Sequence, residues 1–508
     1  MEANTRTRYS FYNFLVSTIA AVILPLIGFV KVSFFVRLYG SDINGLQLTI
    51  AQVITFLNIC ELAYSLAFRQ LLYKPLAEND HEEVNRIYTG ARRIFRITGC
   101  VMLVCSVLVA LIFPNLSESP LSYWQTTGTF LLLACPYGIS YFLMGPNFVI
   151  MADQKEYKIN IWIQSISILR MLLMITAIFM KMPFITILII EGANILCANF
   201  LARRIALRTY PWLHEEKDSK DHQFADKAGY AVVQRLSELA TTQTDNIVIT
   251  GFMGYAMSSV FGSYSYLSDN IGKITQTMIQ SPMNSFGNLF NDKSVRSYDV
   301  FAEFFNFASF MSTIVACEIF IVMPQFMPLW MRNSLYQASV PICFFVSCNI
   351  FYMTTRQPVM IARDTNGLYV NAKNNAYLLA AVKIILSVLL VSQFGLLGAV
   401  VATTVSYLTV DFTYNPKLVY DRVFQLPVQR YYRMFVLRFL IGLTVGAAGY
   451  LGWHQFIAYS SSSLTHFVIS ALILGICITI VVFVLYYALF RSFRNLLSRI
   501  LSVLKGRK

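Results

Sequence analysis

The residues most able to do chemistry in this sequence are basic side chains inside long apolar segments. They are Lys31, Arg170, Arg235, Lys273, Arg356 and Lys383. An ionised side chain at mid-bilayer costs at least about 2.5–3.5 kcal/mol, so each should face the interior of a helix bundle or a water-filled cavity. A guanidinium in such a cavity can bind a phosphate group through two hydrogen bonds. The pattern therefore predicts an anion-binding site at membrane depth.

These cations can be ranked as candidates for anion binding by their depth in the membrane and by the acidic residues near them in the sequence. At about 1.5 Å per residue, Arg170, Lys273 and Lys383 lie nearest the middle of their segments. Arg235 has an acid three residues later, Glu238, and Lys273 has one four residues earlier, so local ion pairs are the competing interpretation for these two. Lys31, Arg170, Arg356 and Lys383 have no acid within four residues, so any partner must come from another helix or from a substrate.

Acidic residues at similar depth suggest a second role. The candidates for coupling to a proton or sodium gradient are Glu61, Asp245, Asp269 and Asp411. Arg235, Glu238, Thr242 and Asp245 share one helical face by their spacing. We expect no catalytic residues, metal site or cofactor, because the sequence contains no nucleotide-binding loop, zinc spacing or nucleophile constellation.

Apolar helices must position these side chains. Only 13% of the 508 residues are charged, against about 25% in a soluble domain. The sequence predicts an all-α integral membrane protein with about 14 transmembrane helices. Their approximate limits are 11–36, 43–68, 94–113, 125–151, 159–180, 184–202, 228–253, 257–286, 304–326, 337–361, 375–393, 396–416, 435–455 and 465–490.

The basic residues also predict the orientation. Of 40 Lys and Arg, most fall at alternate connections, whereas the predicted external loops carry Arg37, Lys181 and Arg332. The positive-inside rule then places both termini in the cytoplasm. Membrane lipids account for this basic character, and no nucleic acid partner is expected because no basic stripe is interleaved with stacking aromatic residues.

A long polar connection divides the predicted helices into two pseudo-symmetric lobes of six. We predict an N-terminal lobe over 1–204, a cytoplasmic linker over 205–227 and a C-terminal lobe over 228–420. Two additional transmembrane helices over 421–490 precede a basic amphipathic tail over 491–508. Pro146 followed by Asp153, and Pro358 followed by Asp364, give a weak echo between the lobes.

Two short motifs carry a resemblance to a known family. Residues 39–46 (YGSDINGL) and 70–77 (QLLYKPLA) resemble the polysaccharide-type flippases of the multidrug, oligosaccharidyl-lipid and polysaccharide (MOP) exporter superfamily. The resemblance implies two lobes around a cationic cavity and alternating access in the cytoplasmic membrane. It also implies an undecaprenyl-diphosphate-linked oligosaccharide as cargo, for capsule, exopolysaccharide or O-antigen synthesis, and polysaccharide assembly proteins as partners.

Two other functions are compatible with the sequence. A multidrug cation antiporter of the same architecture would favour acids over bases at its centre. The multidrug branch of the superfamily typically has an acid in the first helix, where this chain has Lys31. A membrane glycosyltransferase or polysaccharide polymerase is the second alternative, although the predicted external loops are short. The sequence therefore favours a transporter over an enzyme.

Overall fold

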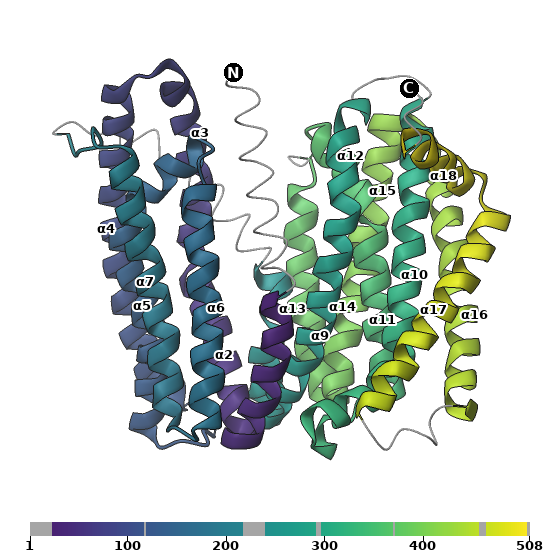
Figure 1. Ribbon diagram of the computed structural model, residues 1–508, viewed down its shortest axis with the longest axis horizontal. Helices are drawn as coiled ribbons and strands as arrows, with labels where there is room; N and C mark the ends of the chain where they lie inside the picture. The colour runs from purple at the N-terminus through teal and green to yellow at the C-terminus, as the bar shows by residue number, and fades with distance from the viewer. Residues whose placement is uncertain are drawn as a thin grey trace. The chain divides into compact units, whose positions relative to one another are not determined.

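The computed structural model describes residues 23–115, 118–216, 239–290, 296–368, 371–456 and 464–504, and these residues contain helices and no strand (Figure 1). Ten of the helices in this part of the chain are long and apolar enough to cross a membrane. The all-α class predicted from the sequence is confirmed, and the chain is a multi-pass membrane protein.

Several predicted spans are interrupted helices. Residues 43–68 were predicted as one span but form α2 (Ser41–Leu57) and α3 (Ile59–Glu78), with a break at Asn58. Residues 337–361 likewise divide into α11 (Val340–Thr355) and α12 (Gln357–Thr365). Pro358 explains the second break, because it lacks an amide hydrogen and its ring clashes with the carbonyl four residues earlier.

A bend in α9 (Asp245–Phe290) falls between two predicted spans. Gly254 has φ 82° and ψ 176°, a left-handed conformation that glycine adopts without steric cost. The predicted spans at 228–253 and 257–286 meet at this point. The first of them begins in residues that lie outside the described part of the chain.

The chain divides into two compact units, Met1–Gly262 and Ser263–Lys508. In unit 1, the first described helix covers residues 23–39, and α2 and α3 follow it. The remaining helices of this unit are α4 (His81–Ile112), a 3₁₀ turn (Phe113–Asn115), α5 (Tyr123–Ala152), α6 (Tyr157–Phe179), α7 (Phe184–Thr209) and the beginning of α9.

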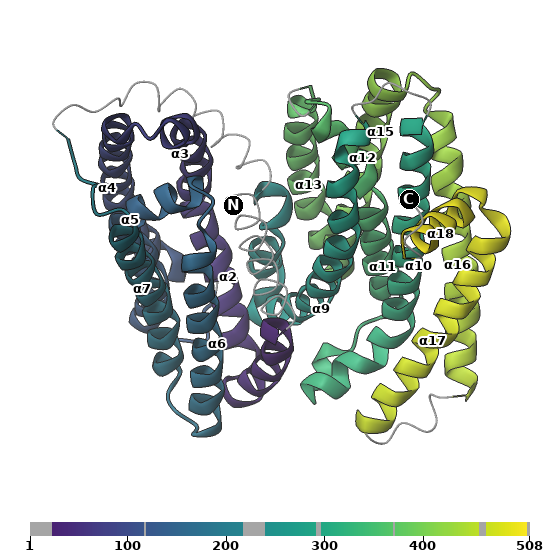
Figure 2. The same cartoon turned by 45° about the horizontal axis from the view of Figure 1, so that its top comes forward.

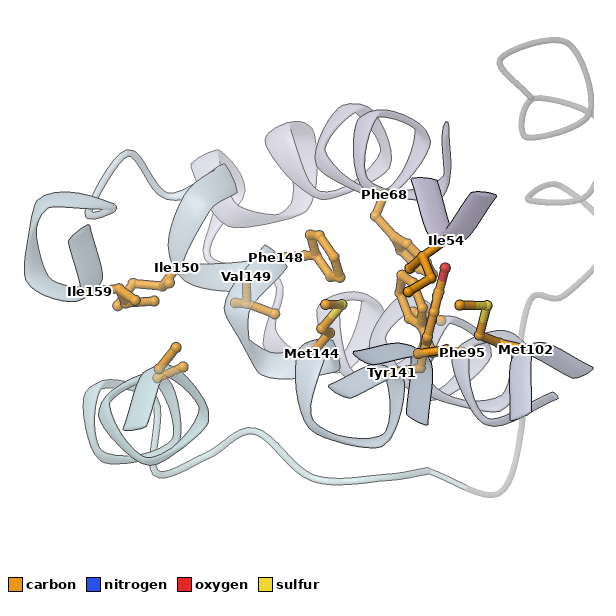
Figure 3. Close-up of a cluster of buried hydrophobic side chains, with 14 of the residues drawn as sticks. Ile54, Phe68, Phe95, Met102, Tyr141, Met144, Phe148, Val149, Ile150 and Ile159 are labelled. Atoms are coloured by element: carbon orange, nitrogen blue, oxygen red, sulfur yellow. The ribbon is translucent and has the colours of Figure 1, made fainter. Parts of the chain in front are cut away.

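The core of unit 1 forms around α5. This helix packs against α3, α4 and α7. Stacked rings from three helices fill the contact: the Phe95 ring lies 5.3 Å from that of Phe68 and 5.1 Å from that of Phe148 (Figure 3). Aromatic pairs at such distances contribute beyond the area that they bury. The helices are therefore fixed close to the polar residues described below.

Unit 2 forms around α10 (Arg296–Met331), which packs against α11, α16 and α17 (Figure 2). Its other elements follow in chain order. They are the 3₁₀ turn Ser334–Tyr336, α11, α12, α13 (Lys373–Phe394), α14 (Leu396–Ser406), a π-helix (Tyr407–Asp411), α15 (Phe412–Val419), a π-helix (Tyr420–Phe424), α16 (Gln429–Phe456), α17 (Leu464–Leu489) and α18 (Arg491–Leu504).

The amphipathic helix α18 lies in the segment predicted as a basic tail. Its buried Phe493 and Leu496 point toward the helices of unit 2, and the Phe493 ring lies 5.2 Å from that of Phe310. Arg499 pairs with Glu303 of α10 at 3.1 Å. The division into lobes at 204 and 228 stays a prediction, since residues 217–238 are outside the described part.

A close helix contact joins α2 to α9 within unit 1. Asn44 donates to Ser259 at 2.7 Å, and the hydroxyls of Thr49 and Thr250 are also 2.7 Å apart. Next to Asn44 on α2, a Cβ at Gly45 would lie 1.7 Å from the carbonyl oxygen of Tyr255 on α9. Only glycine fits at this position while the two backbones are in contact.

We therefore predict that Gly45→Ala lowers the free energy of unfolding by about 1–3 kcal/mol, the usual cost of overpacking. Denaturation in mixed micelles measures this loss. Gly128→Ala in α5 is the matched control, because a Cβ there meets nothing within 4 Å. Equal stabilities of the two variants would contradict the predicted contact.

Candidate functional site

A group of charged side chains in unit 1 joins three helices. Arg170 of α6 forms an ion pair and hydrogen bond with Glu191 of α7, and both side chains remain about one-fifth exposed (20% and 21%). Lys31 lies within electrostatic range of both residues, and its Nζ is 5.1 Å from the centre of the Phe35 ring. The predicted cations Lys31 and Arg170 thus come within range of each other and of the same carboxylate, Glu191.

Polar residues at the α2–α3 break extend this group. Asn58 donates to Glu61 at 2.5 Å, and the Tyr141 hydroxyl donates to the Asn58 side-chain oxygen at 2.7 Å. Tyr137 lies within electrostatic range of both Glu61 and Glu191. Among the described residues, no basic side chain forms an ion pair with Glu61. The coupling candidate Glu61 therefore belongs to the same polar region as Lys31 and Arg170.

In unit 2, Arg356 and Asp411 form a buried ion pair at 3.0 Å. The same carboxylate accepts from the Tyr352 hydroxyl at 2.6 Å and from the Asn415 amide at 2.7 Å. The ring of Tyr407 lies 4.9 Å from the guanidinium carbon. Charge-assisted hydrogen bonds are the strong ones, so this network holds both charges in the interior. Asp411 is engaged through both of its oxygen atoms.

Lys383 is completely buried on α13. Its ammonium donates to the Thr403 hydroxyl of α14, the next helix along the chain. Beside it, Thr404 donates to Asn349 of α11 at 2.8 Å. A strongly hydrated ammonium is stable at such depth only with polar partners. The predicted cation Lys383 thus belongs to the packed interface of α13 and α14.

Lys273 of α9 differs from the other cations. Its side chain is exposed, and no described carboxylate lies within ion-pair distance of it. The alternative of a local pair with Asp269 is therefore not formed, although Asp269 is also exposed and makes other contacts. Among the predicted cations that the structure describes, Lys273 is the most available to an outside anion.

Of the remaining predicted residues, the structure describes Asp245 and Asp269, both on α9. Arg235 and Glu238 lie outside the described part of the chain. Asp245 begins α9 in unit 1, next to Asn246, whose amide donates to Gln52 at 3.1 Å. Asp245 and Asp269 therefore belong to different units.

An apolar groove of about 450 Å³ lies between α10, α11 and α16 in unit 2. Bulky side chains such as Phe320, Phe344 and Tyr450 line it, and Gly442 and Gly446 on α16 leave the space. The groove was not predicted, because glycine four residues apart in an apolar helix is also common where helices pack closely.

Arg438 on α16 was also missed. It is 4% exposed, and it donates to the Asn306 oxygen at 2.9 and 2.5 Å and to the Met434 carbonyl at 2.6 Å. Its guanidinium carbon lies 4.1 Å from the centre of the Phe490 ring. No described carboxylate pairs with it. The sequence could have indicated this residue, because position 438 is a basic residue within the predicted span 435–455.

Comparison with known proteins identifies the fold. No family model matches the chain, and no curated protein matches it. Among solved structures, the lipid II flippase MurJ in an inward closed conformation aligns with a TM-score of 0.73 and 13% identity, over 94% of this chain and 100% of that one.

Two further structures share the fold. An inward-facing multidrug resistance MATE transporter of the MOP superfamily aligns with a TM-score of 0.57 and 12% identity, over 79% of this chain and 98% of that one. A MOP superfamily transporter from Pyrococcus furiosus, described by the reversed polarity of its binding pocket, aligns with a TM-score of 0.53 and 10% identity, over 82% and 95%. The chain therefore has the fold of MOP superfamily transporters.

The buried Arg356–Asp411 pair gives a stability prediction. Asp411→Asn leaves the guanidinium without its countercharge, so we expect a loss of about 3–5 kcal/mol in the free energy of unfolding. Replacing both residues, as in Arg356→Met with Asp411→Leu, should recover part of it. Denaturation in mixed micelles measures both.

Asp364→Asn serves as the control, because that carboxylate is 52% exposed and its partner Arg363 is its immediate neighbour. Its removal should change the free energy of unfolding by less than about 0.5 kcal/mol. A loss at position 411 as small as the loss at position 364 would mean that the ion pair contributes nothing to stability.

Proposed function

We propose that this protein is a flippase that moves an undecaprenyl-diphosphate-linked oligosaccharide from the inner to the outer leaflet of the cytoplasmic membrane by alternating access. Its product would serve the synthesis of capsule, exopolysaccharide or O-antigen. Both termini would be cytoplasmic, as the distribution of Lys and Arg predicts. Polysaccharide assembly proteins would receive the cargo on the outer side.

The observation that carries the proposal is the exposed position of Lys273 on α9. A cation within a membrane-spanning helix is expensive unless it is paired or faces water or an anionic ligand. Lys273 is exposed on α9 and has no ion-pair partner among the described carboxylates. A diphosphate headgroup supplies the missing negative charge. Within unit 1, Lys31 and Arg170, each in range of Glu191, are the cations that could attract an anionic group.

The apolar groove supports a substrate with a lipid tail. It lies in the same unit as Lys273, and Phe320, Phe344 and Leu451 give it a hydrocarbon surface. A long isoprenoid chain matches such a surface, because neither has hydrogen-bonding groups to satisfy. The fold shared with a lipid II flippase supports the same class of cargo. A headgroup site and a tail groove together fit a lipid-linked sugar.

A multidrug cation antiporter is the second candidate, and Glu61 favours it. Its carboxylate accepts from Asn58 and has no basic partner among the described residues, so a cationic drug would find a negative charge there. The shared fold with a MATE transporter is compatible with this function. The two candidates differ in the charge of the substrate, and one pair of assays separates them.

The first assay uses the purified protein in liposomes that contain a fluorescent undecaprenyl-diphosphate oligosaccharide. Loss of fluorescence to an external quencher reports the fraction of lipid in the outer leaflet. We expect Lys273→Ala to slow transfer by roughly ten- to a hundredfold, since a hydrogen bond to a charged group contributes about 1.5–3 kcal/mol. Lys273→Glu should slow it further through repulsion of the headgroup.

Lys417→Ala is the matched control, because Lys417 is also an exposed lysine of unit 2 and has no predicted role at the site. It should flip lipid at the wild-type rate. The second assay measures export of a cationic dye by the same liposomes. Dye export that requires Glu61, with no lipid transfer, would replace the flippase proposal by the antiporter.

A further inference from the structure

A carboxyl group that the proposed function does not use lies between α10 and α17. Glu318 of α10 faces Gly475 of α17, where a Cβ would lie 3.3 Å from Glu318 Oε2 and 3.6 Å from Oε1. The glycine thus leaves the space that the carboxyl group occupies. The Oε2 atom is buried and has no hydrogen-bond partner among the described residues.

The surroundings of this carboxyl group are apolar. One helical turn away on either side, Ile314 and Val322 belong to a hydrophobic cluster that also contains Ile478 and Leu474 of α17. α17 is the most apolar of the candidate spans, with a mean hydropathy of 3.1. It contains no Asp, Glu, Lys or Arg between Leu464 and Leu489. Among the described residues of this interface, no basic side chain forms an ion pair with Glu318.

Charged groups on the helices around α10 are engaged elsewhere. Arg438 of α16 binds Asn306, three turns of α10 before Glu318. Arg356, between α11 and α12, pairs with Asp411, and Arg499 of α18 pairs with Glu303.

Other titratable side chains on these elements also leave Glu318 without a countercharge. They are Tyr298, Asp299 and Cys317 on α10, Cys343, Cys348 and Tyr352 on α11, Arg363 and Asp364 on α12, Arg430, Tyr431, Tyr432, Arg433, Tyr450 and His454 on α16, His466, Cys477, Tyr486 and Tyr487 on α17, and Arg491 and Arg494 on α18. None of these basic groups forms an ion pair with Glu318, and Cys317 donates to the Gly442 carbonyl at 3.4 Å.

We propose that Glu318 is a proton-binding site whose neutral form allows α17 to pack against α10. An ionised carboxylate at this position would be desolvated without a countercharge, and such groups take up a proton instead. Separation of the two helices would admit water and release the proton. By linkage, a higher proton concentration favours the packed arrangement, and packing favours proton binding.

This site is new relative to the proposed function, because it needs neither Lys273 nor a lipid-linked substrate. It lies on helices other than those of the coupling candidates Glu61, Asp245, Asp269 and Asp411. A proton that binds in one helix arrangement and leaves in another gives the protein a response to pH.

Dicyclohexylcarbodiimide tests the protonation state directly, because it reacts with neutral carboxyl groups in apolar surroundings. The full-length protein in liposomes is treated at several pH values, and mass spectrometry locates the adduct. We expect the adduct on Glu318 at about pH 6, with a yield that falls roughly tenfold by about pH 9 as the group ionises. Glu303 is the internal control: its Oε2 is also buried without a hydrogen-bond partner, but its Oε1 pairs with Arg499 at 3.1 Å, so it should be modified less than Glu318.

A stability measurement tests the link to packing. If the packed state requires a neutral Glu318, proton binding stabilises it, and this stabilising effect is complete at low pH and is lost as pH rises and the carboxyl group ionises. The melting temperature of the wild-type protein should therefore fall between about pH 6 and pH 9 more steeply than that of Glu318→Gln, whose amide cannot ionise. Glu303→Gln controls for the loss of a carboxylate elsewhere on α10.

Two results would overturn the proposal. An adduct yield at Glu318 that does not exceed that at Glu303 would show that the carboxyl group is ionised or hydrated. Identical dependences of the melting temperature on pH for wild-type protein and Glu318→Gln would show that protonation of Glu318 does not affect helix packing. Lipid transfer is read out in neither experiment, so failure here is distinct from failure of the flippase proposal.

Discussion

The free-energy cost of placing an ionised side chain in hydrocarbon constrains this structure more than any other factor. Each ionised side chain within a membrane helix needs a countercharge, a set of dipoles or water. The chain uses all three solutions. Arg356 has a carboxylate, Arg438 has amide and carbonyl oxygens with an aromatic ring, and Lys273 is exposed. These choices separate cations that stabilise the fold from those that remain available to a ligand.

The same constraint explains how far the sequence could be interpreted. Apolar segments about 20 residues long predict membrane helices directly, because the bilayer fixes their length. The partners of the cations are harder to predict. Arg170 meets Glu191, 21 residues later, and Arg356 meets Asp411, 55 residues later, so no local spacing reveals either pair. Only the packing of neighbouring helices brings them together.

Local spacing was misleading at two other positions. Asp269 precedes Lys273 by one helical turn, yet the two do not form an ion pair, and Asp269 makes other contacts instead. Arg438 lies near the end of a predicted span, where a basic residue usually marks the cytoplasmic interface. The structure buries it among Asn306, Phe305 and Phe490. Sequence position alone does not distinguish these environments.

The two kinds of surface in unit 2 give the proposed cargo its physical basis. An exposed ammonium on α9 suits a diphosphate, and an apolar groove beside α16 suits a hydrocarbon chain. Each alone is common in membrane proteins. Their presence in one compact unit supports the proposal of an amphiphilic substrate rather than a purely polar or purely cationic one.

The environment of Arg438 has a consequence for biosynthesis. Its ring partner Phe490 and Ser492, whose hydroxyl accepts from Asn306 at 2.5 Å, both come later in the chain than Arg438. Because chains are made from the N-terminus, the guanidinium enters the membrane before these partners exist. Assembly around Arg438 must therefore wait until Phe490 and Ser492 have been made, and a stop codon before Phe490 would leave the guanidinium without its ring partner.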